Sequence, residues 1–221
     1  MVDPLPRADL LAAGRDADVY SWGAMRVLRR YRDGCDATPE AEVMRHVAGY
    51  GYPVPYVYSA AGPDLVMERL DGPTMWAAVQ EGDLAVDHAA TILVSLADRL
   101  HRIPGRSCAA EGARVLHLDL HPLNVMLVPS GPVVIDWRNA RDGDPHLDVA
   151  MSALILAQVA VSGAEGCQEA RAMLTVFVPS AGYDPRHRLV QALHMRRLDA
   201  NLTADELECL TAAAALVRAS A

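Results

Sequence analysis

The segment from residue 115 to residue 137 constrains the fold of this chain more than any other, and it reads VLHLDLHPLNVMLVPSGPVVIDW. Two short apolar runs flank Pro-Ser-Gly at residues 129–131, which has the composition of a tight turn. A polar loop precedes the first run. This pattern predicts a β-hairpin whose open end meets the loop, so that the side chains of Asp119, Asn124 and Asp136 converge on one point.

The spacing of these polar residues resembles the catalytic loop of kinase-like enzymes. A His-x-Asp motif at residues 117–119 is followed by Asn124, and a short hairpin then ends in Asp136. His-Leu-Asp stands where protein kinases have His-Arg-Asp, and Ile-Asp-Trp stands in place of Asp-Phe-Gly. Both differences are typical of the aminoglycoside phosphotransferase and choline kinase-like branch, which this chain resembles.

The resemblance implies a role for each of these residues in phosphoryl transfer. Asp119 would position the acceptor hydroxyl and help to deprotonate it. Asn124 and Asp136 would hold magnesium, which prefers oxygen ligands. His117 would support the loop by bonding to backbone, and Asp148, in the family-like segment Gly-Asp-Pro-His-Leu-Asp-Val-Ala, would bond back to the loop. ATP and Mg2+ are the expected cofactors.

A metal hydrolase is an alternative interpretation of the same loop. His117, Asp119 and His121 alternate, so an extended strand would place them on one face, as in some zinc sites. Pro122 favours a loop after His121, and no other histidine-rich cluster in the sequence completes a zinc site.

Residues 8–32 predict a small antiparallel sheet that would cover a nucleotide. A strict Gly-x-Gly-x-x-Gly motif is absent, and Gly14 is the one glycine in the expected phosphate-covering turn. Backbone N–H groups from Gly14 onward are able to cover phosphates, although the same residues also fit an ordinary hairpin.

The third predicted strand carries an arginine where kinases carry a nucleotide-binding lysine. No lysine occurs in the sequence, and Val-Leu-Arg ends at Arg29, so the resemblance implies that Arg29 contacts the phosphates. A helix is predicted over residues 37–51, with Thr38 as its N-cap. Glu40 on this helix would pair with Arg29, with Glu42 as the second choice; alternatively, both glutamates are surface acids near the helix start.

The strand predicted over residues 65–75 would lead into the connection between two lobes. By resemblance, Met67 lies behind the adenine, and the carbonyl of Glu68 and the amide of Leu70 face the base. Asp-Gly-Pro at residues 71–73 has the composition of a turn.

The rest of the chain predicts helices, so the expected fold is α+β and kinase-like. Periodic apolar residues indicate a helix over residues 84–102 and a buried helix ending near residue 160. Further helices are expected over 165–178, 185–198 and 203–219, the last with a capping box from Thr203 to Glu206. The sequence thus predicts a nucleotide-binding β lobe over residues 1–70 and a helical catalytic lobe with the acceptor site over residues 71–221.

Composition limits the classes of partner. The net charge of −8 argues against nucleic acid and suits a cationic small substrate. No apolar run reaches the length of a membrane span, the first ten residues lack a signal-peptide pattern, and the four cysteines have no paired spacing. These features predict a cytoplasmic protein without a membrane or nucleic-acid partner; they carry no signal for an oligomeric state.

The predicted function is transfer of the ATP γ-phosphate to a hydroxyl group of a small molecule, such as an aminoglycoside or other antibiotic, a sugar or an amino alcohol. Only residues 105–114 separate two predicted elements between which related antibiotic kinases usually carry extra acceptor-binding helices, which favours a smaller acceptor. The alternative is a nucleotide-binding protein with weak or no transferase activity, which the missing lysine and the sparse glycines would favour.

Overall fold

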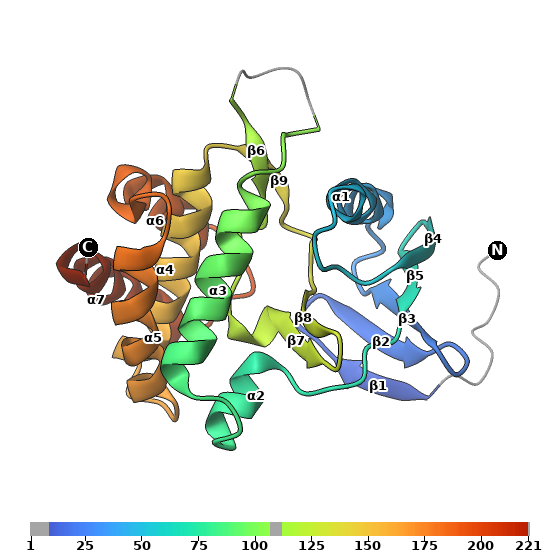
Figure 1. Ribbon diagram of the computed structural model, residues 1–221, viewed down its shortest axis with the longest axis horizontal. Coiled ribbons are helices and arrows are strands. Elements are labelled where there is room, and N and C mark those ends of the chain that lie inside the picture. The colour runs from blue at the N-terminus through green and yellow to red at the C-terminus, as the bar shows by residue number, and fades with distance from the viewer. Residues whose placement is uncertain (1–8, 107–111, 221) are drawn as a thin grey trace. The chain divides into compact units, whose positions relative to one another are not determined.

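The computed structural model describes residues 9–106 and 112–220, so half of the short segment at 105–114 lies outside the described residues. The chain divides into two compact units, Met1–Asp71 and Gly72–Ala221. The first is a sheet with one helix, and the second is mainly helical (Figure 1). The predicted α+β class is confirmed.

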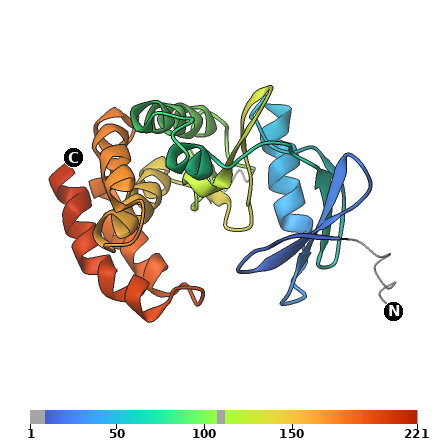
Figure 2. The ribbon, with the colours of Figure 1, turned by 90° about the horizontal axis from the view of Figure 1, so that it is seen from below.

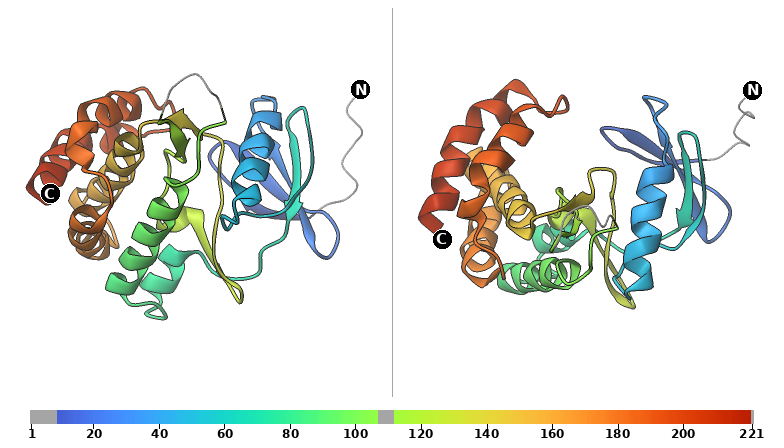
Figure 3. Two further views of the ribbon diagram at one scale, coloured as in Figure 1. Left: turned by 45° about the horizontal axis from the view of Figure 1, so that its top comes forward. Right: turned by 90° about the horizontal axis from the view of Figure 1, so that it is seen from above.

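The first unit contains a five-stranded antiparallel sheet in the order β1-β2-β3-β5-β4. Helix α1, Thr38–Gly49, follows β3 and lies beside the sheet (Figure 3). Arg29 and Tyr31 alternate with Leu28 and Arg30 along β3, so both point toward this helix, where they contact Glu40. The strands are β1 Leu10–Ala13, β2 Ala17–Ser21, β3 Arg26–Tyr31, β4 Val57–Ala61 and β5 Asp64–Glu68.

The start of α1 differs from the prediction. Thr38 is the first helical residue rather than the N-cap, which is Ala37. Asp36 supplies the missing acceptor: its Oδ1 accepts hydrogen bonds from the backbone N of Thr38 at 3.0 Å and from its hydroxyl at 2.7 Å. An Asp two residues upstream therefore does the capping that the sequence assigned to the threonine.

Helix α4 is the centre of the second unit. It is buried along almost its whole length because its residues are apolar on nearly every face. The other long helices surround it (Figures 1 and 2). The helices are α2 Met75–Gln80, α3 Val86–Leu100, α4 Pro145–Val161, α5 Cys167–Ser180, α6 Leu189–Arg197 and α7 Ala204–Ser220, with 3₁₀ turns at Pro122–Asn124 and Pro185–His187.

The predicted hairpin is present as β7, Val125–Val128, paired with β8, Gly131–Val134. A second short pair joins β6, Arg114–Leu116, to β9, Arg141–Gly143. Strand β9 and helix α2 were not predicted, because each is too short to show a periodic pattern. The predicted capping box is confirmed: Glu206 N donates to Thr203 Oγ1 at 3.2 Å, and Thr203 N donates to Glu206 Oε2 at 2.8 Å.

Two sequence-level expectations concern membranes and thiols. Within the described ranges, no helix combines the length and apolarity needed to cross a membrane. Cys35, Cys167 and Cys209 form no disulfide with described residues, and Cys108 lies outside the described residues.

Gly72 lies where the chain passes the β7–β8 hairpin. A Cβ atom at this position would stand 2.0 Å from the carbonyl oxygen of Leu127, and the residue has φ +156°. Gly82 also has a left-handed φ, +80°, but a Cβ atom added to Gly82 would have no atom within 4 Å. We expect Gly72→Ala to lower the free energy of unfolding by about 1–3 kcal/mol more than Gly82→Ala, because only the first adds a clash. Chemical denaturation of both variants measures the difference; equal losses would contradict the close approach.

Candidate active site

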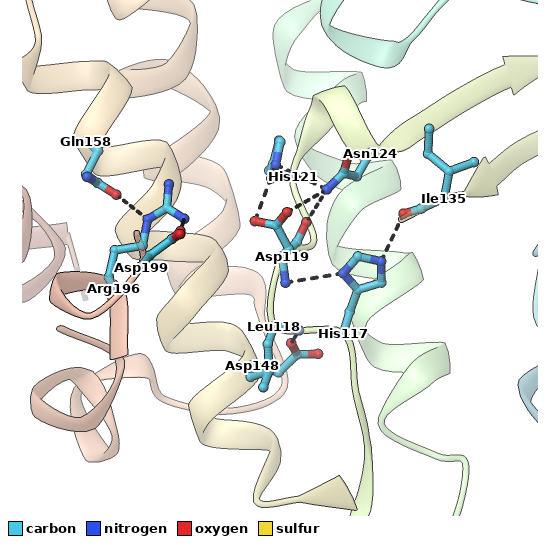
Figure 4. Close-up of polar contacts among 10 residues, drawn as sticks. All are labelled: His117, Leu118, Asp119, His121, Asn124, Ile135, Asp148, Gln158, Arg196 and Asp199. Atoms are coloured by element: carbon cyan, nitrogen blue, oxygen red, sulfur yellow. Dashed lines mark hydrogen bonds and ion pairs between the residues drawn. The ribbon is translucent and has the colours of Figure 1, made fainter. Parts of the chain in front are cut away.

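The loop between β6 and β7 brings Asp119 and Asn124 together (Figure 4). The Nδ2 group of Asn124 donates to the backbone oxygen of Asp119 at 2.8 Å and to its Oδ2 at 3.0 Å. Because Nδ2 faces Asp119, the amide oxygen Oδ1 is turned away from it. This oxygen makes no hydrogen bond with any residue that the structure describes, although Asn124 is only 8% exposed. It is therefore a candidate ligand for a cation.

Asp136 lies at the open end of the hairpin, next to the same asparagine. The backbone N of Ile135 donates to the backbone oxygen of Asn124 at 3.0 Å, and Asp136 is the next residue. Asp136 has φ +65°, and Leu118, beside Asp119, has φ +63°. These are the only non-glycine residues with positive φ among those described. Such conformations cost about 1–3 kcal/mol each and tend to occur at functional sites, where surrounding contacts enforce them.

His117 ties the loop to the hairpin end. Its ring is fully buried and lies edge-on to Trp137, with ring centroids 4.7 Å apart. Nδ1 accepts a hydrogen bond from the backbone N of Asp119 at 3.2 Å, and Nε2 lies 3.1 Å from the backbone oxygen of Ile135, to which it donates. Both contacts are satisfied by the tautomer with its proton on Nε2.

The contacts of His117 also bear on the metal-hydrolase alternative. Neither ring nitrogen is available to a zinc ion, because both are used in backbone hydrogen bonds in the buried interior. His121 lies instead against Asp119, with Nε2 3.5 Å from Oδ1. Among the described residues, no group of three His, Cys, Asp or Glu side chains is arranged to hold a metal ion.

Asp148, in the first turn of α4, holds the strained part of the loop. Its Oδ1 accepts a hydrogen bond from the backbone N of Leu118 at 2.6 Å, and its Oδ2 lies 2.8 Å from Nε2 of His101. Burial raises the pKa of Asp148, but the hydrogen bond and electrostatic attraction of His101 and the hydrogen bond from the Leu118 N–H outweigh it and lower the pKa overall. No local sequence pattern points to this contact of His101, because its partner is 47 residues away.

The environment of Asp119 favours its ionised form. Burial raises the pKa of this carboxyl, whereas the hydrogen bond from His121 and the electrostatic attraction of His121 and Arg196 lower it, with a net lowering. An ionised carboxylate is an acceptor only, so it is suited to receive a hydrogen bond from a substrate hydroxyl. Its side chain is 21% exposed, which leaves room for that contact.

In the first unit, the structure brings together Arg29 and Glu40. Nη1 of Arg29 lies 2.5 Å from Oε1 of Glu40, and the hydroxyl of Tyr31 donates to Oε2 of the same glutamate. Both members of the pair are buried, whereas Glu42 is exposed. The glutamate holds the arginine in one orientation with a charge-assisted hydrogen bond.

The remaining residues that the sequence singled out lie at turns and strand ends of this unit. Gly14 closes the β1–β2 turn by donating its N–H to Ala17 O at 2.9 Å. Met67 is half-buried on β5. Glu68 is the last residue of that strand, and its Oε2 accepts a hydrogen bond from the backbone N of Tyr56 at 3.1 Å. Among described residues, none accepts a hydrogen bond from the backbone N of Leu70, so this amide is open to a ligand.

Comparison with known proteins decides the family. The model of the phosphotransferase enzyme family, APH, matches residues 8–115 and 109–184, which is most of the chain. The chain belongs to the phosphotransferase enzyme family. No curated protein matches the sequence. The family assignment supports a small-molecule phosphotransferase, and the loop from His117 to Asn124 together with Asp136 lies within the matched ranges.

Solved structures show the same fold. The aminoglycoside phosphotransferase APH(4)-Ia is 17% identical with a TM-score of 0.64, covering 97% of this chain and 94% of its own. The streptomycin–ATP ternary complex of APH(2")-IIa is 14% identical with a TM-score of 0.57, covering 86% and 83%. The amicoumacin kinase hAmiN, in complex with AMP-PNP, Ca2+ and Ami, is 13% identical with a TM-score of 0.53, covering 96% and 88%. The predicted family and the kinase-like fold are confirmed.

A separate acidic residue links α4 to the turn before α6. Asp144 caps α4, and its oxygens also accept from Nδ1 of His146 and Nε of Arg188, each at 2.8 Å. Burial raises the pKa of Asp144, but the hydrogen bonds from His146 and Arg188 outweigh it and lower the pKa from 3.8 to about 2.

The stability contributed by Asp144 should depend on pH. Because the pKa of Asp144 is lower in the folded state than in the unfolded state, its ionised carboxylate stabilises the fold at pH values above the unfolded pKa. This stabilisation is lost as the pH falls from about 4, near the unfolded pKa, to about 2, the folded pKa. We expect Asp144→Ala to lower the free energy of unfolding by about 1 kcal/mol at pH 6, the usual worth of a cap, and by less near pH 2. Thermal denaturation at the two pH values checks this; an unchanged difference would disagree with it.

Proposed function

We propose that this family member is an ATP- and magnesium-dependent kinase that phosphorylates a hydroxyl group of a small molecule. The observation that carries the proposal is the pairing of Asp119 with Asn124 at the open end of the hairpin that leads to Asp136. Related structures that contain ATP with streptomycin, or AMP-PNP with Ca2+, support a nucleotide and a divalent cation as ligands.

The donor atoms suit magnesium. Asn124 offers an amide oxygen without a hydrogen-bond partner in the described chain, and Asp136 offers a carboxylate. Magnesium in kinases is held by one or two such protein oxygens, with water and phosphate oxygens completing the shell. When bound, the ion neutralises charge on the phosphates.

The protein's own groups position the reactants. The Asp119 carboxylate accepts the hydrogen bond of the acceptor hydroxyl, orients its oxygen toward the γ-phosphate, and takes up the proton as transfer proceeds. His117 and Asp148 keep the Asp119 backbone in place through the contacts described above. Preorganised charge of this kind accounts for much of the rate in phosphoryl transfer.

The nucleotide is assigned to residues of the first unit. Arg29, held by Glu40, binds phosphate oxygens in place of the usual lysine, and backbone N–H groups at Gly14 cover the phosphates. Met67 packs against the adenine, while the carbonyl of Glu68 and the open amide of Leu70 bind its edge. The acceptor is an aminoglycoside or other antibiotic, a sugar or an amino alcohol, and the protein acts in the cytoplasm.

A nucleotide-binding protein without transferase activity is the second candidate. The observations that favour it are the absence of lysine from the whole sequence and the single glycine of the β1–β2 turn. Incubating the protein with Mg-ATP and a panel of hydroxylated compounds, followed by mass spectrometry, separates the two. If the protein is a kinase, one acceptor should yield a product that is 80 Da heavier, and this product should be absent with Asp119→Asn. Nucleotide binding without any such product would favour the second candidate.

Arg29 tests how the nucleotide is held. We expect Arg29→Met to raise the KM for ATP about 10- to 100-fold, because a hydrogen bond to a charged group is worth about 1.5–3 kcal/mol. Arg30→Met is the matched control: Arg30 pairs with Asp64 at 2.5 Å on the opposite face of β3. Steady-state kinetics that give both variants the same KM for ATP would remove Arg29 from the proposed site.

A further inference from the structure

Arg196, on α6, is the basic residue whose position is best fixed near the catalytic loop. Its Nε donates to Oε1 of Gln158 at 2.9 Å, and its Nη1 donates to Oδ2 of Asp199 at 3.1 Å. Gln158 is itself buried on α4 and donates its Nε2 to the backbone oxygen of Glu206 at 3.0 Å. The guanidinium is therefore held from two sides rather than left on a mobile surface side chain.

The same contacts leave part of the guanidinium open. Nη2 of Arg196 makes no hydrogen bond within residues 9–106 and 112–220, and Nη1 has a second N–H. The side chain is 15% exposed, so these groups are sheltered but accessible. Two adjacent N–H groups on a planar fork match the two oxygens of a carboxylate.

Arg196 also acts on the catalytic loop. Its positive charge is among the influences that Asp119 experiences, and the two side chains appear in the same region of the helical unit (Figure 4). A second arginine lies nearby: Arg141 is opposite Leu116 in the β6–β9 pair, and its Nη2 is 3.9 Å from the sulfur of Met195. The C-terminal end of α6 therefore has two guanidinium groups, those of Arg196 and Arg141, against one carboxylate paired with Arg196, that of Asp199.

We propose that Arg196 binds an acidic group of the acceptor, so that the substrate is a hydroxyl-bearing carboxylic acid rather than a polyamine such as an aminoglycoside. The proposal rests on the kinase function inferred above, and it replaces the aminoglycoside and amino-alcohol acceptors named there with an acidic one. A carboxylate on the open edge of the guanidinium would hold a hydroxyl of the same molecule toward Asp119. An ammonium group there would meet like charge, which strongly disfavours binding.

The experiment compares compounds that share a carbon skeleton and differ in charge. Gluconate, glucose and glucosamine form one such set, and a panel of short hydroxy acids with their amides and amino-alcohol counterparts extends it. Binding is measured by calorimetry with Mg-AMP-PNP present, and transfer is measured with Mg-ATP. We expect binding and phosphorylated product among the acids, with ammonium compounds at least about 10-fold weaker.

Two variants separate Arg196 from general charge effects. Arg196→Gln should weaken binding of the acids about 10- to 100-fold, the range for losing a charged hydrogen bond, and leave nucleotide binding unchanged. Arg197→Gln is the matched control, because Arg197 is the next residue on α6, is exposed and makes no hydrogen bond or ion pair with described residues; it should change neither the binding of acids nor that of nucleotide.

Each outcome bears on one claim. Preference for the ammonium compounds, equal effects of the two variants, or no binding of any acid would overturn the role of Arg196. Phosphoryl transfer to an amino sugar that is lost in Asp119→Asn would also overturn the role of Arg196, but it would support the kinase function. Binding of acids that depends on Arg196 without any product would instead support this site and count against phosphoryl transfer.

Discussion

Replacing Asp119 with asparagine is expected to reduce kcat for phosphoryl transfer about 10²- to 10⁴-fold, the usual contribution of a positioned general base. Asparagine keeps the size of the side chain and one oxygen that can accept the Asn124 amide, so the loop should keep its shape. What it loses is the ionised carboxylate that orients the acceptor hydroxyl. The affinity for Mg-AMP-PNP should not change, since the assigned nucleotide and metal residues are intact.

The measurement is product formation at saturating ATP and acceptor, together with nucleotide binding by calorimetry. Asp83→Asn is the control, because Asp83 is exposed in the turn between α2 and α3 and its side chain makes no hydrogen bond or ion pair with described residues. Turnover in Asp119→Asn equal to that of the control would remove Asp119 from the mechanism.

Replacing Asp148 with alanine is expected to lower the free energy of unfolding by about 3–5 kcal/mol, the cost of leaving one partner of a buried pair uncompensated. The change leaves two groups without their acceptor in the interior: the backbone N–H of Leu118 and the Nε2 group of His101. Because Leu118 has a strained backbone, its relaxation should also displace Asp119 and lower kcat.

Asp148→Asn separates the two contacts. It keeps an oxygen for the Leu118 N–H but removes the charge that faces His101, so it should cost less stability than the alanine. A double-mutant cycle between His101→Ala and Asp148→Ala should give a coupling energy of about 0.5–3 kcal/mol, as for residues in one network. Additive losses, or a small effect of Asp148→Ala alone, would argue against a loop held from α4.

The sequence was most informative where local pattern and chemistry coincide. The hairpin was predictable because two apolar runs flank a turn, and the meeting of Asp119 with Asn124 follows from a spacing that one loop can accommodate. Glu40 could be preferred over Glu42 only by resemblance; the structure gives the physical reason, since Glu40 faces β3 and Glu42 faces solvent.

The features that were missed depend on contacts between distant segments. The partner of His101 lies on α4, and the partners of Arg196 lie on α4 and beyond α6, so no local pattern reveals them. In the sequence, Arg196 stands next to Arg197, and no local pattern separates the two. Only the packing of α6 against α4 distinguishes it from its exposed neighbour Arg197.

The most direct test of the proposed site is the binding of Mn2+, as a spectroscopic substitute for Mg2+, followed by electron paramagnetic resonance. We predict that the wild-type protein with AMP-PNP binds Mn2+, and that Asn124→Ala and Asp136→Asn each weaken this binding at least about 10-fold, since the first removes a ligand oxygen and the second removes the negative charge of the other ligand. Asp83→Asn should not change it. Mn2+ binding that is unaffected by both substitutions would contradict the account.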